Sequence, residues 1–113
     1  IVLAGYAMGS VDNWQGLTPF VTGSVLWSLY SFLHTPHSFL DTMATAIGVG
    51  GDVDTTAAMA GAVSGAYLGI ENLPQNLAEY LTDQGEWGYE DLIQLAVTLY
   101  EIKVQLGISE PYP

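Results

Sequence analysis

The sequence contains no cysteine, almost no basic residues and few charged side chains of any kind. Without cysteine, disulfide bonds and thiolate metal sites are excluded, and the redox compartment is undetermined. Lys103 is the single basic residue against twelve Asp and Glu, which gives a net charge of −11 with His neutral. Such a chain lacks the basic patch that nucleic-acid binding requires. It would also repel an anionic substrate unless metal ions neutralised the site.

The low content of charged residues sets a second constraint. Charged residues make up 12% of the 113 residues, well below the usual quarter, whereas 50% are hydrophobic. We therefore expect an exposed apolar face that another segment or a second copy covers. The apolar run 57–70 is too short to span a bilayer, so no membrane association is expected. No signal peptide is recognisable, and the expected location is the cytoplasm.

Hydrophobic periodicity predicts an all-α chain. Helices are predicted over residues 22–34, 36–47, 54–69, 73–82 and 89–106, and residues 1–9 are typical of the end of a buried helix. Residues 9–22 and 83–88 have the composition of a loop and a turn. In the central helix, Gly61, Gly65 and Gly69 recur every fourth residue, which predicts another helix backbone packed closely against that face.

The residues with the clearest chemical potential begin the central helix. Asp52, Asp54, Thr55 and Thr56 follow the glycine-rich residues 48–51. Two carboxylates and two hydroxyls within five residues are the hard oxygen ligands that Mg²⁺, Mn²⁺ or Ca²⁺ prefer. The spacing excludes an EF-hand, whose loop requires a Gly and a Glu where this chain has Ala and Val. The structural alternative is that Asp54 caps the helix and Asp52 interacts with the helix dipole.

A longer motif resembles a known family. The sequence GGDVDTTAAMAGAVSGAYLG (residues 50–69), followed by Asn72-Leu73-Pro74, resembles the C-terminal metal motif of the ADP-ribosylglycohydrolase family. A weaker similarity covers Ser24-Val25 and LWSLYSFL, residues 26–33. The resemblance implies an all-α, orthogonal helical bundle. It also implies hydrolysis of an N- or O-glycosidic bond between ADP-ribose and a protein side chain or small molecule.

The resemblance further implies a site with two Mg²⁺ (or Mn²⁺) ions, which would orient the ribose and a water molecule and stabilise developing charge. Asp54 would bridge both ions and be the catalytic residue, with Asp52 and the Thr55 hydroxyl completing one coordination sphere. Phe20 and Gly51 would contact the substrate. Trp14 and Phe20 lie in the same loop and would stack on an adenine or line the ADP-ribose cleft. The alternative is that both anchor the loop to the core.

The sequence lacks two motifs of the family's first half, a Gly-Asp-Ala-Leu-Gly-like motif and Thr-Asp-Asp. It also has Leu77 where the family often has an aromatic residue. Because the chain starts at Ile1 in an apolar stretch, we expect residues 1–113 to be the C-terminal segment of a single domain. The N-terminal half would then supply the remaining ligands, and this chain alone would be inactive.

Two further interpretations remain open. The protein would be a non-enzymatic, crystallin-like relative if the motif were retained without activity. It would be a helical interaction module if Asp52 and Asp54 served only the helix terminus. His34 and His37, which flank the second predicted junction, have a metal or catalytic role as one alternative and a surface turn position as the other.

Overall fold

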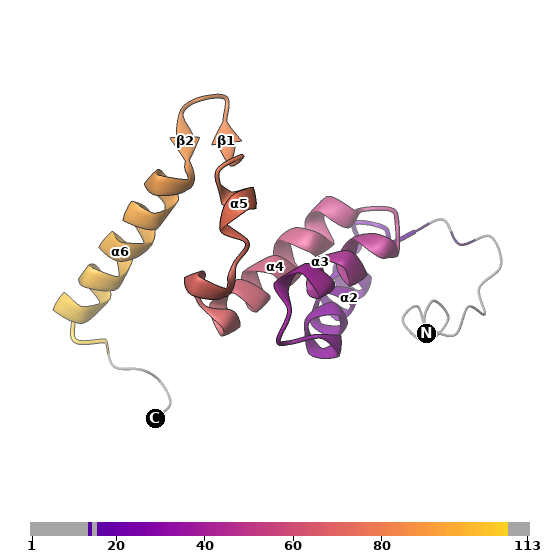
Figure 1. Cartoon of the computed structure of the whole chain (residues 1–113). Coiled ribbons are helices and arrows are strands. Elements are labelled where there is room, and N and C mark those ends of the chain that lie inside the picture. Colours follow the sequence, from indigo (N-terminus) through magenta and orange to yellow (C-terminus); the bar gives the residue numbers. More distant parts are fainter. Residues whose placement is uncertain (1–13, 15, 109–113) are drawn as a thin grey trace. The chain divides into compact units, whose positions relative to one another are not determined.

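A computed structural model describes Trp14 and residues 16–108, which fall into two compact units, each considered by itself. The first contains α2 (Val21–His34), α3 (Phe39–Gly48), α4 (Val53–Leu68) and the 3-10 turn η1 (Ile70–Asn72) (Figure 1). The second contains α5 (Gln75–Ala78), β1 (Thr82–Asp83), β2 (Trp87–Gly88) and α6 (Tyr89–Gln105). The predicted all-α class is confirmed, because the strands of the described chain form only one short hairpin. The predicted helix end over residues 1–9 lies outside the described residues.

The helix boundaries differ from the predicted ones where local hydrogen bonds decide them. Residues 35–38 form a turn closed by the N–H of Ser38 and the carbonyl of Thr35, so α3 starts at Phe39 instead of at Pro36. Ser38 caps α3, since its hydroxyl accepts the Asp41 N–H at 3.3 Å. For α2, Phe20 occupies the N-cap position without a side-chain cap, so the predicted Thr22 or Ser24 cap is wrong.

Three helices of the first unit pack on one another around a small, partly polar interior. α4 lies against both α2 and α3. One cluster consists of Ala46, Ala57 and Ala60, where α3 meets α4, and another of Leu17, Trp27 and Val49. The remaining buried residues are hydroxyl-bearing: Ser24, Ser28, Ser31, Thr42, Thr56 and Ser64. Such small side chains allow the helices to approach closely, at the cost of burying hydroxyl groups that need partners.

The most apolar face of α2 is not its buried face. Ser24, Trp27, Ser28 and Ser31 point into the unit, whereas Val21, Val25, Leu26, Leu29 and Leu33 are exposed. Apolar residues at three-four spacing would ordinarily face a core. Their exposure gives the first unit an apolar surface of the kind that composition predicted.

The central helix uses its glycines differently from the prediction. A Cβ at Gly61 would meet Sδ of Met43 at 3.2 Å, and one at Gly65 would meet the side chain of Leu73 at 3.9 Å. Gly69 follows the last residue of α4, with a φ of 77°. The prediction of a helix backbone close to this face is therefore wrong, because side chains fill the space.

The second unit has no buried residue among those described. β1 and β2 pair antiparallel around a turn in which Gly85 has a φ of 87°. α6 begins where a side-chain oxygen of Asp91 accepts the Gly88 N–H at 2.8 Å. Its apolar residues at the predicted helical spacing, Leu92, Leu95, Leu99 and Ile102, remain exposed.

Candidate functional site

The glycine loop, residues 48–51, carries the chain from the end of α3 to the start of α4. Gly50 and Gly51 have φ angles of 76° and 83°, a region that side chains with a Cβ rarely adopt. This double left-handed step turns the chain so that Asp52 becomes the N-cap residue of α4. Glycine is favoured at both positions because a residue with a Cβ is strained at such a positive φ.

Asp52, Asp54 and Thr55 lie together on the first turn of α4. The Thr55 hydroxyl donates to Oδ1 of Asp52 at 3.0 Å, and Oδ1 of Asp54 accepts the Thr55 backbone N–H at 3.0 Å. Asp54 and Thr55 are exposed, and Asp52 is half-buried. The capping alternative is therefore met in part: Asp54 binds a first-turn N–H, whereas Asp52 occupies the cap position without a side-chain bond to the backbone.

The two carboxyl groups interact electrostatically. A side-chain hydrogen bond with Asp52, followed by the backbone N–H of Thr55, lowers the pKa of Asp54 below its ordinary value of 3.8. The side chain of Asp54 is therefore ionised over the whole neutral range. An ionised carboxylate beside a second carboxyl group is a favourable place for a cation.

An anchor segment, which we define as Trp14, Gly16 and Leu17, holds the glycine loop from the other side. The N–H of Leu17 donates to the carbonyl of Gly50 at 2.9 Å, and the N–H of Asp52 donates to the carbonyl of Leu17 at 2.8 Å. The indole N–H of Trp14 donates to the carbonyl of Val49 at 2.6 Å. Trp14 thus anchors the loop to the core, as its structural alternative predicts.

Trp27 and Thr56 also stabilise the junction between α3 and α4, through hydrogen bonds to backbone carbonyls. The indole N–H of Trp27 donates to the carbonyl of Ala46 at 3.2 Å, in the last turn of α3. The Thr56 hydroxyl lies within 3.4 Å of the same carbonyl and 3.3 Å of the Asp52 carbonyl. Thr56, although adjacent to the candidate ligands, is fully buried and structural.

The other predicted site residues are less closely connected. Gly51 lies in the loop beside Asp52, whereas Phe20 is the N-cap residue of α2, with 70% of its surface exposed. His34 stacks on Tyr30, and His37 lies against Tyr67. Both histidines are exposed near the α2–α3 turn, as their structural alternative predicts.

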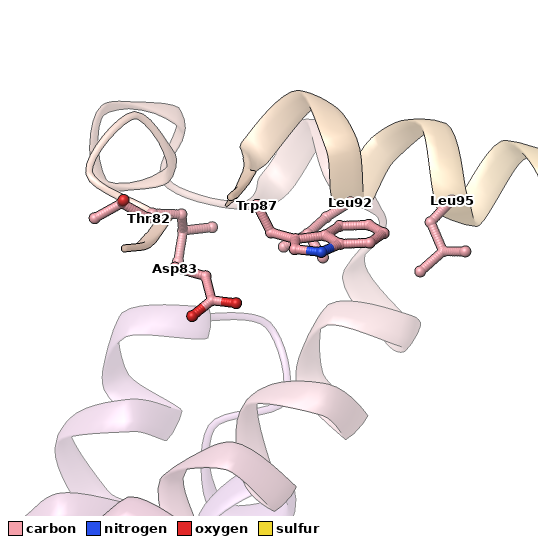
Figure 2. Close-up of a pocket in the computed structure, with 6 residues that line it drawn as sticks. Thr82, Asp83, Trp87, Leu92 and Leu95 are labelled. Atoms are coloured by element: carbon pink, nitrogen blue, oxygen red, sulfur yellow. The ribbon is translucent and has the colours of Figure 1, made fainter. Parts of the chain in front are cut away.

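The second unit contains a hollow that sequence analysis missed. It has a volume of about 470 Å³ and is lined by Leu81, Thr82, Asp83, Trp87, Leu92 and Leu95. Figure 2 shows the indole of Trp87 alongside α6, with Asp83 on the facing strand of the hairpin. The sequence indicated only a turn here. The available signal for a hairpin was Gly85 midway between Asp83 and Trp87, with Leu81 two residues before Asp83.

The described residues contain neither a self-sufficient metal-binding group nor a membrane-spanning helix. Within this part of the chain, no group of three or more His, Asp and Glu side chains could by itself hold a metal ion. None of the helices described is long and apolar enough to cross a membrane.

Comparison with known proteins identifies the family. The model of the ADP-ribosylglycohydrolase family matches residues 4–106, so the chain belongs to this family of hydrolases. ADP-ribosylhydrolase ARH3 of Bos taurus is 36% identical over 89 residues, which cover 70% of this chain and 23% of the relative. The Xenopus tropicalis ADP-ribosylhydrolase ARH3 is 44% identical over 85 residues, covering 64% and 24%. The chain thus spans about a quarter of the length of these relatives. No solved structure gave a significant match.

Proposed function

We propose that this chain supplies one side of a binuclear metal site that hydrolyses the glycosidic bond between ADP-ribose and a protein side chain or small molecule. The observation that carries the proposal is the cluster of Asp52, Asp54 and Thr55 on one exposed helical turn. Membership of the ADP-ribosylglycohydrolase family and the names of the relatives support the reaction class.

The donor set fits the metal that the family implies. Carboxylate and hydroxyl oxygens suit Mg²⁺ or Mn²⁺, and the lowered pKa of Asp54 keeps its carboxylate available. Three protein ligands are fewer than the six oxygens of an octahedral site. Water molecules and residues from family segments outside this chain would supply the others. For that reason we expect the chain alone to bind metal weakly and to be inactive.

Each residue then has a defined role. Asp54, the more exposed carboxylate, would be the catalytic residue and would bridge two Mg²⁺ (or Mn²⁺) ions, with Asp52 and Thr55 as ligands of one of them. Ions held there would supply positive charge that polarises the scissile linkage and a water molecule. Gly51 is exposed beside the carboxylates, and its backbone and the exposed ring of Phe20 would contact the ADP-ribosyl group.

A titration with Mn²⁺, followed by electron paramagnetic resonance, tests the site. The free-ion signal should fall as the chain binds Mn²⁺, and Asp52→Asn should prevent that fall. Asp83→Asn is the matched control, because Asp83 is an exposed carboxylate of the hairpin. Equal behaviour of both variants would favour the alternative function, a non-enzymatic relative or helical interaction module. The first-turn hydrogen bonds of Asp52, Asp54 and Thr55 are the observation on which that alternative depends.

The exposed apolar residues of α2 have a place in the same proposal. Val25, Leu29 and Leu33 lie on one face at intervals of four residues and are 38%, 42% and 68% exposed. We assign this face to contact with the family segments that lie outside this chain. Sedimentation of the chain alone checks the other occupant, since a stable dimer that Leu29→Gln dissociates would show that a second copy covers the face.

A further inference from the structure

The anchor segment bonds to the glycine loop on both sides of Gly51. Leu17 uses both its N–H and its carbonyl on the two residues that flank Gly51, in a parallel bridge. Its side chain is 6% exposed and packs with Trp27 and Val49. The backbone amide of Asp52 is therefore fixed to a residue that is itself fixed in the core.

The anchor segment and the glycine loop also approach without space for adjustment. A Cβ at Gly51 would overlap the backbone of Leu17, and a Cβ at Gly16 would overlap the backbone of Gly50 and Gly51. Backbone in this contact can shift only by breaking the hydrogen bonds that cross it. The direction in which Asp52 projects from the chain is consequently set by residues more than thirty positions earlier in the sequence.

Trp14 contributes a side-chain hydrogen bond to this arrangement. Its indole N–H reaches the carbonyl of Val49, the residue between the last turn of α3 and the two left-handed glycines. Trp27 provides a natural comparison, because its indole N–H also donates to a backbone carbonyl of this junction. The acceptor of Trp27 lies within α3, whereas the acceptor of Trp14 lies in the glycine loop. The two indole N–H groups therefore end on different segments, α3 and the glycine loop, although the ring of Trp27 also packs against Leu17 and Val49.

We propose that Trp14 is a positioning residue for the Asp52 carboxylate: it holds the glycine loop in the register in which Asp52 and Thr55 together face a divalent cation. This inference rests on the proposed function, since it concerns the same metal ligands. In this role Trp14 acts through the backbone of residues 49–52. Residues that orient metal ligands typically contribute about 10–100-fold to metal affinity.

The test compares Trp14→Phe with Trp27→Phe in the whole 113-residue chain. Each variant keeps an aromatic ring and loses one N–H donor. Mn²⁺ affinity is measured by electron paramagnetic resonance, the fold by circular dichroism and melting, and the Asp52 amide by hydrogen exchange. Trp14→Phe should weaken Mn²⁺ binding about tenfold and accelerate exchange of the Asp52 amide. Trp27→Phe should lower the melting temperature further, because Trp27 is 1% exposed. Its phenyl ring still packs against Leu17 and Val49, so the Mn²⁺ affinity of the folded chain should stay within about twofold.

Four outcomes would overturn the positioning role of Trp14. Wild-type affinity in folded Trp14→Phe would overturn the positioning role and leave the proposed function intact. Loss of the helical signal in Trp14→Phe would also overturn it, since Trp14 would then serve the fold as a whole. Equal weakening by both substitutions would do the same. Absence of Mn²⁺ binding by the wild-type chain would overturn the proposed metal site, and this inference with it.

Discussion

The hydroxyl of Thr55 donates a hydrogen bond of 3.0 Å to the carboxylate of Asp52, across the first turn of α4. The two residues are three positions apart, a spacing that places side chains on one face of a helix. The bond brings the hydroxyl oxygen of Thr55 and a carboxylate oxygen of Asp52 together, and Asp54 lies between the two residues in sequence. Two of the three candidate ligands are thereby arranged before any ion arrives, which lowers the ordering cost of binding one.

The carboxyl pair gives a prediction about pH. Because a hydrogen bond with Asp52 is the main cause of the lowered pKa of Asp54, Asp52→Ala should raise the pKa of Asp54 toward 3.8. Because the pKa of Asp54 is lower in the folded state than in the unfolded state, its ionised carboxylate stabilises the fold at pH values above the unfolded-state pKa. This stabilisation is lost as the pH falls through the folded-state pKa. The group is exposed, so this contribution is small. A carbon-detected NMR titration measures the shift, and an unchanged midpoint in Asp52→Ala would contradict the assigned cause.

Ser64 gives a prediction about stability. Its hydroxyl oxygen is fully buried and has no hydrogen-bond partner among the described residues. Ser64→Ala removes an unsatisfied polar atom and should leave the free energy of unfolding unchanged or raise it by up to about 1 kcal/mol. Ser28→Ala is the control, since the Ser28 hydroxyl lies 2.7 Å from the carbonyl of Ser24 and 3.2 Å from that of Thr56. It should cost about 0.5–1.5 kcal/mol in chemical denaturation, and an equal cost for both variants would show that Ser64 has a partner.

The glycine loop supplies a matched pair of substitutions. Gly50 and Gly51 both have positive φ, so alanine at either position carries the penalty of a left-handed residue, about 1–2 kcal/mol. At Gly50 the nearest atom to an added Cβ is the Cα of Gly16 at 3.9 Å, an ordinary contact. At Gly51 the Cβ would overlap Leu17, so Gly51→Ala should be the more destabilising variant in thermal melts. Equal melting temperatures for Gly50→Ala and Gly51→Ala would mean that the backbone of Leu17 can move away from Gly51 at little cost in stability.

The features that depend on local interactions were predictable from the sequence. The helix that carries Asp52 to Thr55 follows from composition and helical spacing, and the proximity of these side chains follows from their separation along one turn. The class of fold was predictable for the same reason. Even the presence of an exposed apolar surface followed from the balance of hydrophobic and charged residues.

The remaining features depend on contacts between distant positions. The bond between Trp14 and Val49 joins residues 35 positions apart, and no local pattern indicates it. Similarly, the periodicity of α2 identifies its apolar face but gives no information about what covers it, so the inward orientation of Ser28 and Ser31 was not predictable. The spacing of Gly61 and Gly65 correctly marked a contact surface, but the contacting groups are the side chains of Met43 and Leu73.

The last prediction concerns Asp54, the residue on which the catalytic proposal depends most. Asp54→Asn removes a negative charge, but the amide oxygen of asparagine can still accept the Thr55 N–H that Asp54 accepts now at 3.0 Å. Asp54 is exposed and follows the N-cap position, so the substitution creates no buried unpaired group. We therefore expect a normal circular dichroism spectrum and a melting temperature close to that of the parent chain.

Metal-dependent behaviour should change at the same time. If Asp54 bridges two ions, loss of its charge weakens both, so the chain should lose Mn²⁺ binding and the complete enzyme should lose release of ADP-ribose from a modified substrate. Asp41→Asn is the matched control, since Asp41 also lies exposed in the first turn of a helix, where its N–H is bonded to Ser38. A purely structural Asp54 makes the opposite prediction, because asparagine preserves the structural bond. Full activity in a folded Asp54→Asn enzyme would exclude this carboxylate from catalysis, and the binuclear site would then need a bridging ligand from outside this chain.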